Sequence, residues 1–271
     1  MEAQLDLLSS ILNTLDTDAE SDQPLDTFDL AAIVNHLCTT LDLPQTLKTL
    51  RQLLIHCEST VLTLFFTNPQ LTEHILKHLT NEQITFDSTK LFSEVFDESL
   101  HSSLITPEFI EKLVDSIGVS DSETCENIVK ALILIARKNL NWILGAKNSR
   151  FFGEALIFRV NWAKGSEKKN LVLTINKVLK ERPEFFYLND LKVVADTLVN
   201  VLVDREEGIL KESYEALNEM MKIEEFCRLG YRFGELAEVL QHSEDDLDIC
   251  EMQCNILVKV ELFAVVRGSE G

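Results

Sequence analysis

Side chains of the types that perform catalysis or bind metals are few in this chain, and their spacing suits neither task. His74 and His78 lie one helical turn apart and could share a cation, but no third ligand accompanies them, so packed or solvated histidines are the simpler interpretation. The acidic run at residues 244–246 lacks the glycine and the regularly spaced oxygens of a calcium loop. No phosphate-binding loop, dinucleotide fingerprint, metalloprotease helix or nucleophile elbow occurs in the sequence. We therefore expect no catalytic residue, no metal and no cofactor.

The cysteines indicate the compartment rather than a site. Six are scattered through the chain without a Cys-x-x-Cys pair, which predicts reduced thiols in a cytoplasmic protein. The first 15 residues lack the basic cluster of a signal peptide, and no stretch is apolar for long enough to cross a bilayer. The net charge of −20 argues against binding to nucleic acid or to anionic membranes. The sequence therefore predicts a cytoplasmic protein with no nucleic acid and no inserted membrane segment among its partners.

One stretch, residues 185–196 with the sequence FFYLNDLKVVAD, combines the features of a binding site with those of a buried helix. Asn189 and Asp190 are both natural N-cap residues, because a short side-chain oxygen can accept from the free amides of the first helical turn. The apolar residues that follow recur at helical spacing, which predicts one buried face on an inner helix. This face comprises Leu191, Val194, Ala195, Leu198, Val201 and Leu202.

A stripe of polar residues runs along the same helix at one-turn spacing. It consists of Lys192, Asp196 and Asn200, on a helix that is otherwise apolar. Such a stripe is what a concave groove would present to a partner, and it is equally what a solvent-facing row would look like. Both interpretations remain open from the sequence.

The charge of the chain is segregated. Residues 1–130 carry a net charge of −16, residues 131–182 carry +8, and residues 183–271 carry −12, which together give −20. This basic band could steer an acidic partner, or it could be an ordinary solvated face. Three further candidates for partner binding lie within it, namely Glu154, Arg159 and Asn161.

Helices are the elements that must position these residues. The 271 residues include only 9 Gly and 5 Pro, and no alternating strand pattern competes with the helical one. We expect residues 1–25 to form an amphipathic helix with an acidic linker, and residues 26–265 to form one helical domain. Towards the C-terminus the expected helices cover residues 139–148 (a helix or turn), 150–162, 167–180, 209–221, 225–241 and 245–263.

The aromatic residues of one predicted helix are expected in the core. Residues 150–162 place Phe151, Ala155, Phe158 and Trp162 on one face. Large aromatic side chains are mostly buried, so we expect Phe151 and Trp162 to pack inside rather than to contact a partner.

Tightly linked helices of this length predict an all-α fold, namely an armadillo/HEAT-like right-handed solenoid of degenerate helical repeats. Repeats of this kind span about 40–47 residues, although no clean period can be extracted here. A compact orthogonal helical bundle is the alternative.

Two stretches carry a resemblance to a known family. Residues 185–196 (FFYLNDLKVVAD) and residues 152–162 (FGEALIFRVNW) resemble the signature segments of the WISH/DIP/SPIN family of armadillo-like proteins, with one predicted helix between them. The resemblance covers roughly residues 120–245. It implies a non-enzymatic protein of the actin cytoskeleton that binds the actin-related protein 2/3 (Arp2/3) complex and activates it without a pre-existing mother filament, so that unbranched seed filaments form.

The resemblance also implies where the protein works and which residues make the contact. It places the protein at the actin cortex or at actin patches, where endocytosis occurs, with the actin filament as an indirect partner. The candidate partner-binding residues are Glu154, Arg159, Asn161, Asn189, Asp190, Lys192, Asp196 and Asn200.

Two other functions compete with this one. The first is a solenoid adaptor that binds a peptide or helix of a different partner in trafficking, nuclear transport or scaffolding. The second is an enzyme that uses an unrecognised carboxylate site, which would require an enclosed pocket with convergent polar groups.

Overall fold

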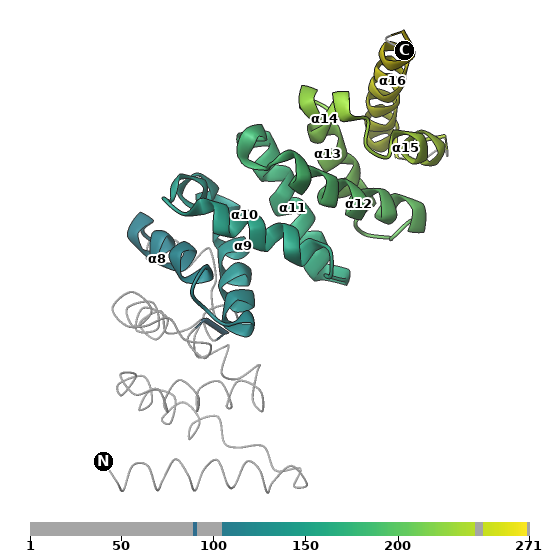
Figure 1. Cartoon of the computed structure of the whole chain (residues 1–271). Helices are drawn as coiled ribbons and strands as arrows, with labels where there is room; N and C mark the ends of the chain where they lie inside the picture. Colours follow the sequence, from purple (N-terminus) through teal and green to yellow (C-terminus); the bar gives the residue numbers. More distant parts are fainter. Residues whose placement is uncertain (1–88, 91–104, 242–245, 270–271) are drawn as a thin grey trace, which may run out of the picture. The chain divides into compact units, whose positions relative to one another are not determined.

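The computed structural model describes residues 89–90, 105–241 and 246–269, and every regular element in these ranges is a helix (Figure 1). The predicted N-terminal helix, the acidic linker and the His74/His78 pair lie outside the described residues. The chain divides into two compact units. Residues 1–135 and 145–147 belong to the first, and residues 136–144 and 148–271 belong to the second.

The described part of the first unit contains α8 (Pro107–Ile117) and the start of α9 (Ser122–Gly145). The backbone N–H of Phe109 donates to Thr106 Oγ1 at 3.2 Å, and Pro107 occupies the first helical turn, where its missing N–H has no cost. Asp121 begins α9 in the same way, since the Thr124 N–H donates to its Oδ1 at 2.9 Å. This hydrogen bond from the Thr124 backbone is the main reason why the pKa of Asp121 is lowered.

Two of the expected helix boundaries differ in the structure. The expected helix or turn at residues 139–148 is present as the last part of α9, which a kink at Asn139 (φ −115°, ψ 29°) separates from the rest of the helix, but it ends at Gly145. Residues 225–241 do not form one helix but two short ones, α14 (Glu224–Leu229) and α15 (Phe233–Val239). Gly230 ends α14 in the left-handed conformation at φ 57°, which a glycine adopts without steric cost.

The second unit contains a series of helices. Besides α14, α15 and the last part of α9, its described helices are α10 (Ser149–Val160), α11 (Gly165–Glu181), the short 3₁₀ helix η3 (Pro183–Phe185), α12 (Leu188–Asp204), α13 (Leu210–Met220) and α16 (Leu247–Ser269). Their main contacts join helices that are one to three positions apart in the chain, such as α10 with α11, α11 with α13 and α13 with α16. Packing between near neighbours along the chain defines an α-solenoid. The predicted all-α solenoid class is confirmed, and the described helices of this unit succeed one another in Figure 1.

Helix α12 is the inner helix that the sequence predicted. It contacts α10, α13, α14 and α15, so it has neighbours on several sides. Its predicted apolar face is buried in full, with Leu191, Val194 and Leu198 each at most 2 % exposed. The face on which the polar stripe lies is therefore fixed by the packing of α12.

Candidate functional site

The two stretches that carry the family resemblance pack against each other. Helix α10 holds the first, η3 and α12 hold the second, and the helices are in contact. Gly153 on α10 lies against the Phe185 ring so closely that an added Cβ would be 2.8 Å from Phe185 Cε1. The Arg150 guanidinium lies 5.1 Å from the Phe185 centroid and 4.3 Å from that of Tyr187. These two segments are separated by one helix in the sequence but are in contact in the fold. The contact between residues 152–162 and 185–196 is termed the junction.

The start of α12 corrects the expected N-cap. The helix begins at Leu188 with Tyr187 as its N-cap, so neither Asn189 nor Asp190 occupies that position. Asp190 is instead the third helical residue, and its Oδ2 accepts from the Tyr187 backbone N–H at 2.9 Å. An acid at this position that reaches back to the cap amide is the second half of a capping box. Asp190 therefore fixes the turn that presents Tyr187 beside Arg150.

The polar stripe of α12 is engaged by the chain itself. The Tyr231 hydroxyl donates to both carboxylate oxygens of Asp196, at 3.0 and 3.1 Å. The Arg232 Nη1 donates to Asp196 Oδ1 at 3.2 Å and to Asn200 Oδ1 at 3.1 Å. Lys192 Nζ donates to Asn189 Oδ1 at 3.2 Å, one turn away on the same helix.

This cluster locks the corner between α14 and α15 onto α12. Arg232 adopts a left-handed conformation at φ 55°, which costs energy for a residue other than glycine, and it also pairs with Glu235. The hydrogen bond to Asp196 is the main cause that raises the pKa of Tyr231, and the hydrogen bond from Arg232 lowers the pKa of Glu235. The sequence did not indicate Tyr231 or Arg232, because they lie more than 30 residues from their partners.

Cations of the basic band form a set of ion pairs within the second unit, which is termed the electrostatic seam. Four of its cations pair with acids, three of which lie on or just before α13. The pairs are Arg159 with Glu167, Lys168 with Glu206 at 2.6 Å, Lys169 with Glu212 at 2.9 Å, and Lys180 with Glu215 at 3.2 Å. Three of these pairs join the basic helix α11 to acids from the acidic segment that follows the band in the sequence, on α13 or in the turn before it. Arg159 and Lys168 are therefore already paired within the chain when no other protein is bound.

We expect the seam to contribute modestly and in a salt-dependent way to stability. The variant Lys168→Ala/Lys169→Ala removes two partly exposed pairs, each worth about 0.2–1 kcal/mol. Urea denaturation should show a lower free energy of unfolding at low ionic strength, and the difference from the wild type should shrink in 1 M NaCl. A difference that does not change with salt would show that these lysines stabilise by packing alone. Lys222→Ala, which loses a pair within one helix turn, is the control.

Three aromatic residues expected in the core face solvent, namely Phe151 and Phe158 on α10 and Trp162 just after its C-cap. Phe151 is 37 % exposed, Phe158 68 % and Trp162 72 %, so the prediction that they pack inside is wrong. Helix α10 buries its opposite face instead. The buried residues are Phe152, Gly153, Leu156, Ile157 and Val160. Apolar residues occupy both faces of this helix, which made its buried side ambiguous from the sequence.

The remaining candidate residues lie around this exposed face. Glu154 and Asn161 are exposed on the same side of α10 as Phe158, and Asn161 ends the helix as its C-cap. Arg159 lies at the other edge with Glu167. The structure therefore groups the candidate site residues into three places: the outer face of α10, the first turn of α12, and the cluster that Asp196 forms with Tyr231 and Arg232.

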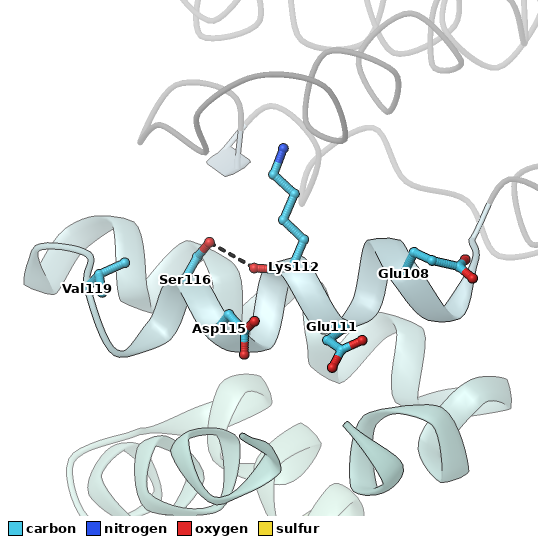
Figure 2. A pocket seen from close by; sticks show the side chains of 6 residues that line it. All are labelled: Glu108, Glu111, Lys112, Asp115, Ser116 and Val119. Atoms are coloured by element: carbon cyan, nitrogen blue, oxygen red, sulfur yellow. Dashed lines mark hydrogen bonds between the residues drawn. The ribbon is translucent and has the colours of Figure 1, made fainter. Parts of the chain in front are cut away.

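A chemical site is not evident in the described part of the chain. No group of three His, Cys, Asp or Glu among these residues could hold a metal ion. A hollow of about 500 Å³ lies along α8, and Figure 2 shows the six described side chains that line it. They all come from α8 and the turn after it, namely Glu108, Glu111, Lys112, Asp115, Ser116 and Val119. Side chains from a single helix do not form the enclosed set of convergent groups that catalysis requires.

Comparisons with known proteins assign neither a family nor a function to the chain. No family model and no curated protein matches the chain, and none of the described helices is long and apolar enough to span a membrane. A designed armadillo repeat protein, solved in complex with the peptide (KR)4, is 17% identical with a TM-score of 0.49, over 85% of this chain and 99% of its own. An engineered protein is 16% identical with a TM-score of 0.48, over 87% of this chain and 97% of its own. At such low identities and TM-scores, the likeness assigns neither a partner nor an activity.

Proposed function

We propose that this chain is a non-enzymatic, armadillo-like protein that binds the Arp2/3 complex and activates it without a mother filament. The proposal rests on the family resemblance of residues 152–162 and 185–196. The observation that supports it is the junction of these two stretches through Gly153, Phe185 and Arg150. Because the two segments pack together, their exposed residues lie close enough to contact a single partner.

The physical mechanism needs no catalytic group. An activator must bind the active arrangement of the two actin-related subunits more tightly than the inactive one, and the difference in affinity sets the shift in population. A rigid helical scaffold suits this task, because little conformational entropy is lost when it binds. The buried inner helix α12 and the locked α14–α15 corner provide such rigidity next to the junction.

Intramolecular hydrogen bonds guide our choice of the residues that we propose a partner contacts. Asp196 and Asn200 are acceptors for Arg232, so we assign them a positioning role. Glu154, Asn161 and Lys192 are exposed or half-exposed at the junction and are better placed for direct contact.

The test compares two matched triple variants. Glu154→Ala/Asn161→Ala/Lys192→Ala removes the exposed polar groups at the junction, and Glu238→Ala/Asn255→Ala/Lys222→Ala removes the same residue types elsewhere in the second unit. Binding to purified Arp2/3 complex and pyrene-actin polymerisation should be measured at two salt concentrations, after melting temperatures have confirmed folding. We expect the first variant to lose at least tenfold in affinity and activation, and the second to behave like the wild type.

Two outcomes would contradict the proposal. If the wild type neither binds the complex nor stimulates polymerisation, the Arp2/3 function is wrong and the adaptor alternative gains support. If the wild type activates and both triple variants activate equally well, the function stands but the contact residues are misassigned.

A further inference from the structure

The outer face of α10 is an exposed aromatic surface that is not packed into the core of the described helices. Phe151 and Phe158 lie seven residues apart on α10, and Trp162 follows four residues later, just after the C-cap Asn161, where the Ala163 N–H still donates to the Arg159 carbonyl, so the three continue one stripe. Their separation of eleven residues corresponds to about 16 Å, or three helical turns. Scattered exposed apolar residues are normal, but three aromatic side chains in one line are not. Aromatic residues, tryptophan above all, dominate the energetics of protein interfaces.

The charges at the ends of this stripe distinguish it from the rest of the molecule. Residues 148–164 contain three cations and one acid, in a chain with a net charge of −20. Arg150, which is half-buried with its guanidinium over the Phe185 and Tyr187 rings, precedes Phe151, and the exposed Lys164 follows Trp162 by two residues. Glu154 is the acid, and it lies to one side of Phe158. The stripe is thus aromatic, and a basic residue stands at each end of it in the sequence.

These features fix the chemistry of the occupant. A second copy of the chain would bring two molecules of charge −20 together, and an anionic bilayer would repel the chain in the same way. A partner helix with an apolar face of three turns matches the length of the stripe, and helices pack by fitting such rows of side chains together. Acidic residues on the ends of that helix would complement Arg150 and Lys164.

We propose that the outer face of α10, centred on Phe158, is a docking surface for an amphipathic α-helix with acidic ends that belongs to a partner protein. The inference goes beyond the proposed function, because it assigns an occupant to a surface whose residues were expected in the core. Burial of Phe158 and Trp162 supplies the affinity. The cations at the two ends fix the position of the helix along the stripe and discriminate against a basic helix.

The experiment uses the full chain with Trp162 as its own reporter. The chain contains two tryptophans, so a Trp142→Phe variant labelled with 5-fluorotryptophan gives a single ¹⁹F signal from Trp162. The probes are two stapled 18-residue helical peptides with leucines on one face, one with glutamates at both ends and the other with lysines. We expect the glutamate peptide to shift the Trp162 resonance and to bind at least tenfold more tightly than the lysine peptide.

Variants then locate the surface. Because its targets are exposed, Phe158→Ser/Trp162→Ser should fold normally and should lose at least tenfold in affinity for the glutamate peptide by calorimetry. Val258→Ser/Leu262→Ser, which replaces exposed apolar residues on α16, should bind like the wild type. Lys164→Glu should reduce the preference for the glutamate peptide.

Each alternative occupant has its own result. The inference is overturned if the glutamate peptide leaves the Trp162 signal unchanged, or if both peptides bind equally. It is also overturned in favour of a second copy if the wild type dimerises and Phe158→Ser/Trp162→Ser is monomeric, and in favour of a membrane if phosphatidylserine vesicles alone shift the signal. Failure of the wild type to bind the Arp2/3 complex would sink the proposed function and leave the peptide result intact.

Discussion

Replacing Leu198 by alanine should lower the free energy of unfolding by about 2–5 kcal/mol. Leu198 is 1 % exposed at the centre of α12, which has neighbours on several sides. Removing its side chain leaves a cavity that the surrounding helices can fill only in part, and the loss of buried apolar surface adds to that cost. Urea denaturation followed by circular dichroism measures the effect as a lower midpoint with little change in slope.

Val203→Ala is the matched control for this prediction. Val203 lies on the same helix and is 55 % exposed, so its replacement should change the free energy of unfolding by no more than about 0.5 kcal/mol. A loss of less than about 1 kcal/mol for Leu198→Ala would mean that α12 is not the inner helix of this unit.

Replacing Gly153 by alanine should destabilise the protein by about 1–3 kcal/mol, even though alanine is the better helix former. The new Cβ would lie 2.8 Å from Phe185 Cε1, and this ring has little room to move. Phe185 packs edge-to-face on Phe186, with ring centroids 5.3 Å apart, and carries the Arg150 guanidinium on its own face. The substitution should therefore also disturb the junction that the proposed function requires.

Gly234→Ala is the control for the Gly153 substitution. Gly234 lies in α15, where an added Cβ would meet nothing within 4 Å, so alanine should raise the free energy of unfolding by up to about 1 kcal/mol. Combining Gly153→Ala with Phe185→Leu should cost less than the sum of the single changes, because the smaller side chain relieves the clash. Equal gains for both glycine substitutions would show that α10 and η3 are not in close contact.

The helical class and the buried face of α12 could be predicted because both depend on local periodicity. Leu191, Val194 and Leu198 recur at helical spacing, and only one face of a helix can satisfy such a pattern. The start of α8 depends on equally local rules, since Thr106 and Pro107 act on amides within one turn of themselves. Local rules missed the N-cap of α12 by a few residues, because Asp190 can accept from the helix start either as a cap or from the third position.

The buried side of α10 could not be predicted, because tertiary packing decided it. Phe151, Phe158 and Trp162 lie on one face and Phe152, Leu156 and Val160 on the other, so periodicity alone offers two solutions. The close contact between Gly153 and Phe185 selects the solution in which the face with Phe152 is buried. A glycine against an aromatic ring allows the backbones of α10 and η3 to approach each other. Neither stretch of sequence indicates that the other is its packing partner.

The roles of the charged residues show the same division. The sequence by itself determined that residues 131–182 are basic and that the flanking residues are acidic. Only the tertiary structure decided that these charges meet, with Lys168 on Glu206 and Arg232 on Asp196, each across more than 30 residues. Helical spacing depends on neighbours within one or two turns, whereas an ion pair depends on which helices pack together. The fold class of this chain therefore follows from local sequence patterns. Whether a charged side chain is free to bind a partner or is held in an intramolecular ion pair depends on long-range packing.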